Sequence, residues 1–281
     1  MDETKKLIAE AIEYEKTGKL HKAIDNYKKV IKLDESRIDI KLNLAALYYA
    51  MGYIAESIDQ YEAIVEKEPT HTFALYKLGI SYYRFSHFSK AVDIFQRVVK
   101  VENDFLMAYI WMGLAYFHCG KIGSSIDSYQ KFLEHNPDSS IANYYIAISY
   151  KLAGKYPKAI EHLNKVLEMH PDHSTAYYHL GESYLAISDI SSAYESFKKV
   201  TEIDPSHNRA RQELMELTTD QDMVYTFGIK SPAKANREDI DMIETNYYIG
   251  RAYRAFSEID KAFKFFRKSV LENKDIDLDI D

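Results

Sequence analysis

Small and apolar residues recur along this chain with a period of 34 residues. In each copy a small residue stands three positions before a tyrosine, as in LGISY (78–82) and MGLAY (112–116). The tyrosines of this pattern are Tyr14, Tyr48, Tyr82, Tyr116, Tyr150, Tyr184 and Tyr253. The steps between them are 34 residues until the last, which is 69, two periods plus one. A fixed period of this length is typical of proteins that stack one supersecondary unit.

Each period predicts two helices joined by a short turn. In residues 174–207, a first face with i, i+3, i+4, i+7 spacing consists of Tyr177, Leu180, Gly181 and Tyr184. A second face with the same spacing consists of Ala193, Phe197 and Val200. Such spacing places side chains on one side of a helix. The polar stretch SDISS (188–192) predicts the turn, and Asp204 with Pro205 predicts the end of the second helix.

Three positions of the unit, counted from its first residue, predict how its helices pack. Position 8 is small in every unit: Ala11, Ala45, Gly79, Gly113, Ala147, Gly181 and Gly250. Position 20 is also small: Ala23, Ser57, Ala91, Ser125, Ala159, Ala193 and Ala262. Position 24 is large: Tyr27, Tyr61, Phe95, Tyr129, Leu163, Phe197 and Phe266. Facing small residues let two helices approach closely, and we expect the large side chain to fill the space beside them.

The unit resembles the tetratricopeptide repeat, a 34-residue helix–turn–helix motif. The resemblance rests on LGxxY at 180–184, AxxxF at 193–197 and the closing prolines Pro69, Pro137, Pro171 and Pro205. Seven repeats fit: 4–37, 38–71, 72–105, 106–139, 140–173, 174–207 and 243–276. The tryptophan that the family has at position 4 is absent, and three repeats lack the proline. The resemblance implies an all-α fold, a right-handed α-solenoid whose first helices line a concave groove.

Residues 208–242 break the pattern. NRARQELMELT (208–218) predicts a helix, whereas the following residues include Gly228 and Pro232 and predict an irregular segment. We interpret 208–242 as a degenerate repeat; the alternative is a capping helix, a linker and a separately docked last pair. After 243–276, residues 275–281 read DIDLDID, which is not a helical pattern. The acidic tail at 277–281 is expected to be solvated, or to be a docking strand for a basic partner.

We predict an apolar lane along the groove of repeats three to five. Positions 2, 6 and 9 of the first helix face the groove in the family and are usually polar, but here most of them are apolar or aromatic. With position 5 included, the lane consists of Phe73, Tyr76, Ile80, Met107, Ile110, Trp111, Leu114, Ile141, Tyr144, Tyr145 and Ile148. An exposed apolar patch marks an interaction site. The alternative is that these side chains pack against neighbouring first helices as core.

The predicted function is therefore that of a noncatalytic adaptor or scaffold. Its lane would bind a peptide or amphipathic helix of another protein. Two alternatives stay open. The chain could be a structural component that self-associates within a larger complex, or a regulator whose 220–240 segment, including MVYTFGI (223–229), occupies the groove until it is displaced.

Charge and composition restrict the kinds of partner and the cellular compartment that we expect. A net charge of -7 disfavours nonspecific binding of nucleic acid. The single cysteine, Cys119, excludes an internal disulfide and fits a reducing compartment. The first residues do not have the apolar core of a signal peptide, and no run of about 18 apolar residues predicts a membrane span. We expect a cytoplasmic protein.

Motifs that carry chemistry are missing from the sequence. No Cys-x-x-Cys or His-Glu-x-x-His pattern predicts a metal site, and the ten histidines are scattered. No phosphate-binding loop, dinucleotide fingerprint or nucleophile elbow predicts catalysis or a cofactor. The family's clamp for acidic chaperone tails also fails to match, since its five positions in repeats one to three hold Ile8, Ile12, Asn43, Phe73 and Lys77. In repeats four to six they hold Ile110, Leu114, Tyr145, Thr175 and His179.

Overall fold

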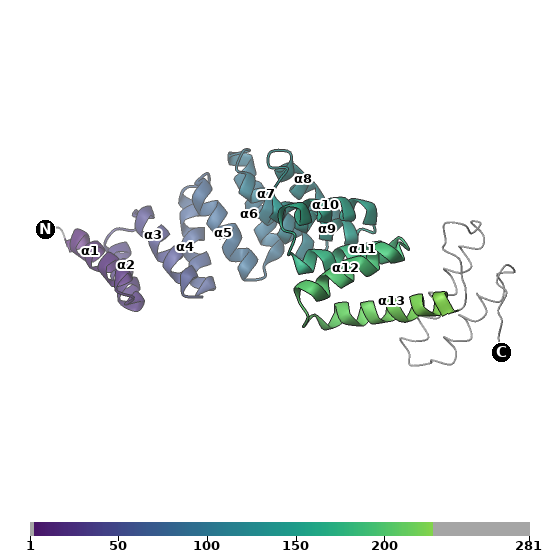
Figure 1. The fold of residues 1–281 in the computed structure, drawn as a ribbon. Helices are drawn as coiled ribbons and strands as arrows, with labels where there is room; N and C mark the ends of the chain where they lie inside the picture. Colours follow the sequence, from purple (N-terminus) through teal and green to yellow (C-terminus); the bar gives the residue numbers. More distant parts are fainter. Residues whose placement is uncertain (1–2, 227–281) are drawn as a thin grey trace. The chain divides into compact units, whose positions relative to one another are not determined.

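The computed structural model describes the backbone of residues 3–226 and the side chains of residues 3–217, and all of its regular elements there are α-helices. Figure 1 shows them in chain order. They are α1 (Glu3–Lys16), α2 (Leu20–Leu33), α3 (Ile38–Ala50), α4 (Ile54–Lys67), α5 (Thr72–Arg84), α6 (Phe88–Val101), α7 (Leu106–His118), α8 (Ile122–Leu133), α9 (Ser140–Leu152), α10 (Tyr156–Met169), α11 (Ser174–Ala186), α12 (Ile190–Ile203) and α13 (Asn208–Thr226).

The described part of the chain divides into two compact units, one that ends at Met169 and one that begins at His170. In the first unit, α1 to α10 form five successive helix pairs, and each pair packs against the next (Figure 1). The first helix of the fourth repeat, α7, also contacts the first helices on either side, α5 and α9. In the second unit, α11 pairs with α12 and α13 packs on α12. The predicted all-α solenoid of helix pairs is confirmed.

The contact between the two helices of each repeat, which we call the seam, confirms the role predicted for the small residues. A Cβ atom added at position 8 would stand 2.6 or 2.7 Å from the nearest ring carbon at position 24. The pairs with this geometry are Gly79–Phe95, Gly113–Tyr129 and Gly181–Phe197. Across the described repeats, positions 8, 20 and 24 are almost fully buried. Where position 20 is serine, its hydroxyl donates to the carbonyl at position 8, as from Ser125 to Gly113 at 2.8 Å.

The turn between the two helices of a repeat needs a left-handed residue. Gly52 has a φ of 84°, and glycine occupies the same place in three other repeats. In the third and sixth repeats a serine takes this conformation, Ser86 and Ser188, each with a φ of 61°. Side chains other than glycine rarely adopt this region. The turn of the sixth repeat is shorter than the predicted stretch 188–192, because the Asp189 side chain caps α12 by accepting the backbone N–H of Ser192.

Several scattered histidines are helix caps. Nδ1 of His71 accepts the backbone N–H of Ala74 at the start of α5. His173 and His207 make the same contact at the starts of α11 and α13, with Ala176 and Ala210 as the last two donors. An acceptor at this position satisfies one of the free N–H groups of a helix N-terminus. Their spacing therefore follows from the repeat.

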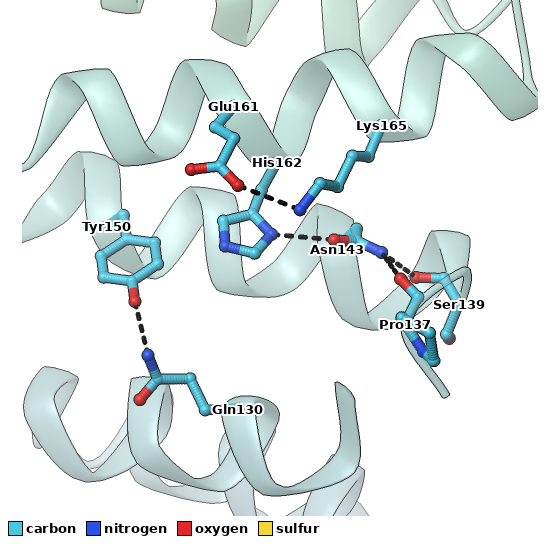
Figure 2. Close-up of polar contacts among 8 residues, drawn as sticks. All are labelled: Gln130, Pro137, Ser139, Asn143, Tyr150, Glu161, His162 and Lys165. Atoms are coloured by element: carbon cyan, nitrogen blue, oxygen red, sulfur yellow. Dashed lines mark hydrogen bonds and ion pairs between the residues drawn. The ribbon is translucent and has the colours of Figure 1, made fainter. Parts of the chain in front are cut away.

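A buried polar network ties α10 to the start of α9 (Figure 2). Asn143 is 1% exposed, and its Nδ2 donates to the carbonyls of Pro137 at 2.8 Å and Ser139 at 2.9 Å. Nδ1 of His162 lies 2.8 Å from Asn143 Oδ1. Burial lowers the pKa of His162 below its ordinary value. The ring is therefore neutral at neutral pH, and its Nδ1–H is placed to donate to the Asn143 amide oxygen.

The helix after the sixth repeat is longer than predicted. It begins at Asn208 as expected but continues to Thr226 instead of ending near 218. Residues 219–226 contain neither glycine nor proline, so nothing in them stops a helix. Part of the 220–240 segment therefore belongs to α13. The rest of that segment, the repeat at 243–276 and the acidic tail lie outside the described residues.

Candidate apolar binding face on α5, α7 and α9

The eleven residues of the apolar lane lie on three first helices that contact one another within the first unit. Phe73, Tyr76 and Ile80 are on α5, and the others are on α7 and α9. Ile80 and Ile110 are buried, at 8% and 6% exposed, so they pack in the core. Tyr76, Trp111, Leu114, Tyr144 and Ile148 are partly buried. The remaining four are exposed: Phe73, Met107, Ile141 and Tyr145.

The most exposed members occupy one repeated position. Phe73, Met107 and Ile141 stand at position 2 of α5, α7 and α9, and they are 50%, 47% and 63% exposed. The first turns of these helices therefore present one large apolar side chain each. We call these three residues the apolar row. Single exposed apolar residues are ordinary, but three at the equivalent position of adjacent helices gather exposed apolar surface at one end of those helices.

Trp111 fixes the centre of the lane. Its Nε1 donates to the hydroxyl of Tyr76 at 3.0 Å, which joins α7 to α5. Its ring stacks on Phe95, with centroids 6.4 Å apart and planes at 16°. Tyr83 meets Trp111 edge-on at 5.4 Å. Burial raises the pKa of Tyr76, and the bond from Trp111 opposes that rise. The lane is therefore a packed aromatic surface whose orientation is set before any ligand arrives.

Two aromatic contacts were not predicted. Tyr83, which is not among the residues of the predicted lane, lies against Trp111 and against His118 at 5.6 Å. His118 stacks on Phe88 at 4.7 Å and 17°. Burial, and then the neighbouring Tyr145, raise the pKa of Tyr83. Tyr83 and His118 stand at positions 12 and 13 of their repeats, so the same register that identified the lane could have included them.

The charged residues of these three helices are all basic. The sequences of α5, α7 and α9 contain no aspartate or glutamate. They do contain Lys77, Arg84, His118 and Lys151. Lys77 lies over the ring of Phe73 at 5.4 Å, and Arg84 lies over the ring of Tyr49 at 4.8 Å. Within these three helices, the charged residues that accompany the lane are thus all basic.

Tyr129 lies below this face. Its ring is fully buried and stacks on Tyr145 at 6.1 Å and 13°. Its hydroxyl is buried without a hydrogen-bond partner in the described structure. Burial raises the pKa of Tyr129 strongly, with Tyr145 and Tyr83 adding to the rise and Ser125 opposing it. The Ser125 hydroxyl itself donates to the Gly113 carbonyl, so it is not a donor to Tyr129. A buried hydroxyl without a partner lowers the stability of the fold.

Other features of the described residues are weaker candidates for a functional site than the lane. A hollow of about 480 Å³ has Glu62, Leu78, Tyr82 and Arg97 among its lining residues, but no residue of the lane. Histidine, cysteine, aspartate and glutamate side chains in the described part form no group of three or more that could hold a metal ion. Within the same residues, no helix has the length and apolar composition that crossing a bilayer requires.

Solved structures share this fold. YrrB is 19% identical with a TM-score of 0.60, and the match covers 66% of this chain and 96% of that one. MamA from Desulfovibrio magneticus RS-1 is 21% identical with a TM-score of 0.58, covering 60% of this chain and 96% of that one. A tetratricopeptide repeat protein from Parabacteroides merdae is 22% identical with a TM-score of 0.51, covering 76% and 83%. At these identities the likeness establishes the fold.

Family models identify the repeats in sequence. Models described as tetratricopeptide repeat match residues 73–101, 128–161 and 150–217, and one described as TPR repeat matches 13–52. Comparison with curated protein sequences gives no match. The matched segments lie in every repeat from the first to the sixth, and they agree with the helix pairs of the structure. The chain belongs to the tetratricopeptide repeat family.

Proposed function

We propose that the apolar lane binds a peptide or amphipathic helix of a partner protein, and that the protein is a noncatalytic adaptor. The observation that carries this proposal is the apolar row: Phe73, Met107 and Ile141 are large, exposed and equivalent in three adjacent repeats. Tetratricopeptide repeat proteins generally mediate protein–protein interactions without catalysis. YrrB, which shares the fold, is described as having an unusual peptide-binding site.

The geometry also suits a moderate affinity. Covering the apolar row and the exposed edges of the aromatic residues would remove roughly 400 Å² of apolar surface from water, about 10 kcal/mol before the costs of association. Those costs cancel much of the gain, so a dissociation constant of about 1 μM is expected. Because Trp111 is fixed by Tyr76 and Phe95, little ordering of this surface is needed on binding.

The test replaces the apolar row and compares it with a matched surface. The lane variant carries Phe73→Gln, Met107→Gln and Ile141→Gln. The control variant carries Leu33→Gln, Val101→Gln and Ile203→Gln, three exposed aliphatic residues at position 30 of their repeats, in the second helices. Proteins retained from an extract of the native host by the full chain are quantified by mass spectrometry. We expect the lane variant to retain its partner about 10-fold less or worse, and the control variant to match the wild type.

Two outcomes would contradict the proposal. Equal retention by the lane variant and the wild type would remove the apolar row from the interface. Equal loss in both variants would show that exposed apolar surface in general, and not this face, captures partners. Circular dichroism of both variants checks that their helices are intact.

A further inference from the structure

Acidic residues are missing from one part of repeats three to five, although the chain is acidic. Residues 71–92, 105–126 and 139–160 each cover a first helix, the turn and the start of the second helix, and none contains aspartate or glutamate. At the chain's average of 43 acidic residues in 281, these stretches would contain about ten. They do contain seven basic residues: Lys77, Arg84, Lys90, Lys121, Lys151, Lys155 and Lys158. Their formal charge is therefore +7 in a chain whose net charge is -7.

The other described repeats do not share this depletion. Of the equivalent stretches, 3–24 contains four acidic residues, and 37–58 and 173–194 contain two each. Helix stability does not explain the difference, because acidic residues in the first turn stabilise a helix, and α5, α7 and α9 have none there. The depletion therefore coincides with the three repeats whose first helices carry the apolar row.

Two cations of α5 lie on aromatic rings and not on carboxylates. Nζ of Lys77 is 5.4 Å from the centre of the Phe73 ring, and the guanidinium of Arg84 is 4.8 Å from the centre of the Tyr49 ring. Neither Lys77 nor Arg84 forms an ion pair with any residue that the structure describes. A contact with a ring orients a cation but does not neutralise it. Both cations can therefore pair with carboxylates of a ligand.

These two cations adjoin the apolar lane. Lys77 follows Phe73 by about one helical turn and lies over its half-exposed ring. Tyr49, which is next to Arg84, packs against the same core cluster as Tyr76 and Trp111. We call the lane together with Lys77 and Arg84 the acid-free face. A ligand that covers Phe73 thus brings its neighbouring side chains close to a cation.

We propose that the acid-free face binds an acidic segment of a partner protein, in which carboxylate side chains flank the apolar residues that cover the lane. The inference rests on the proposed function of the lane and names the class of its partner. An apolar side chain packs on Phe73 while a carboxylate beside it pairs with Lys77, and a second carboxylate pairs with Arg84. The same cations disfavour basic segments. The carboxylates belong to side chains and not to a chain terminus, because the family's clamp for acidic chaperone tails is not matched here.

Selection from a random peptide library tests the proposal without knowledge of the partner. Displayed peptides of about 15 residues, long enough to cross three helices, are selected for binding to the full chain. Peptides that also bind the lane variant (Phe73→Gln, Met107→Gln and Ile141→Gln) are discarded. We expect the remaining peptides to contain acidic residues at about twice the library frequency or more, beside apolar residues. The net charge of -7 opposes this result, so an acidic preference would come from the local charge of the face.

Charge reversal checks that the two cations are responsible. The face variant carries Lys77→Glu and Arg84→Glu. The control carries Lys29→Glu and Lys100→Glu, which are exposed on α2 and α6 and change the net charge equally. The tightest selected peptide that lacks tryptophan, amidated at its C-terminus, is titrated against each variant and followed by the fluorescence of Trp111, the only tryptophan of the chain. We expect the face variant to bind it about 10-fold more weakly or worse, and the control less than about 2-fold more weakly. Changing the peptide's carboxylates to amides should weaken binding to the wild type but add little in the face variant.

The proposal is overturned if the lane-dependent peptides show no acidic excess over the library, or if both charge reversals weaken binding equally. It is also overturned if light scattering detects a dimer of the full chain that the lane variant abolishes, because a second copy would then occupy the face. Lane-dependent peptides without an acidic excess would leave the proposed function standing. If no selected peptide depended on the lane, the proposed function would fail together with this inference, so the two failures are distinguishable.

Discussion

The first helices of repeats one and two and those of repeats three to five share one framework and differ on their surface. Position 8 is buried and small in all five, from Ala11 to Ala147. Position 2 differs, with Lys5 and Asp39 in the first two repeats and the exposed apolar row in the next three. Packing between helices dictates the framework residues, whereas the surface residues are under no such constraint. Function is therefore best read from the surface positions at which the two sets differ.

The largest expected effect tests whether the framework is set by packing. Gly113→Val places a branched side chain where a single Cβ already lies 2.6 Å from the Tyr129 ring. We expect the free energy of unfolding to fall by about 3 kcal/mol, because the two helices of the fourth repeat must separate. Urea unfolding followed by circular dichroism measures this loss.

The matched control is Gly123→Val in α8. A Cβ at Gly123 would meet nothing within 4 Å. We expect a change within about 0.5 kcal/mol, since an exposed helical site gains little from either residue. A similar loss in both variants would contradict the role of the seam. Repeats one and two, with Ala11 and Ala45 at this position, show that a methyl group is accommodated, so valine is the more decisive substitution.

A smaller loss of stability is expected from a substitution on the buried face of α9. Asn143→Ala leaves the carbonyls of Pro137 and Ser139 without their side-chain donor, and removes the oxygen that His162 contacts. Buried polar groups that lose their partners cost about 2 kcal/mol of stability. Urea unfolding should show this loss.

Asn164→Ala is the control, since Asn164 is exposed on α10. It should change the free energy of unfolding by less than about 0.5 kcal/mol. An equal effect of the two substitutions would mean that the network in Figure 2 does not hold the fifth repeat together. Partner retention should be unaffected by Asn143→Ala at temperatures where the protein is folded, because Asn143 is not part of the lane.

Most of the framework could be predicted from the sequence because it repeats. The period, the helix pairs and the close approach of Gly113 to Tyr129 all follow from spacing within one unit. The exposure of the lane could not be predicted residue by residue. Ile80 and Ile110 have the same chemistry as Ile141 but are buried, because burial depends on which helices pack around each position and not on the residue itself.

The polar network and the lack of acidic residues on α5, α7 and α9 were missed for different reasons. Asn143 and His162 are 19 residues apart, and their contact depends on how α9 and α10 pack. The absence of acidic residues from three helices is visible in the sequence, but only when those helices are grouped because they adjoin. The continuation of α13 to Thr226 was missed because the glycine and proline beyond it were taken to affect the residues before them.

The smallest expected effect on stability concerns the buried tyrosine at position 24, which can be compared between the two sets of repeats. Position 24 is Tyr27 in the first repeat and Tyr129 in the fourth. The Tyr27 hydroxyl donates to Glu15, which stands at position 12 of the first repeat, in α1. Position 12 of α7 is Phe117, and the Tyr129 hydroxyl has no partner in the described structure. The lack of acidic residues on α7 therefore leaves a buried hydroxyl unsatisfied.

Tyr129→Phe should consequently stabilise the protein by about 1 kcal/mol, because it keeps the ring that fills the seam and removes only the unsatisfied hydroxyl. Tyr27→Phe should have the opposite sign, since it leaves Glu15 without its donor. Urea unfolding of the two variants measures both changes. Destabilisation by Tyr129→Phe would show that the hydroxyl is satisfied in solution. The opposite signs would show that the acid-free face costs stability, as expected where side chains are retained for binding.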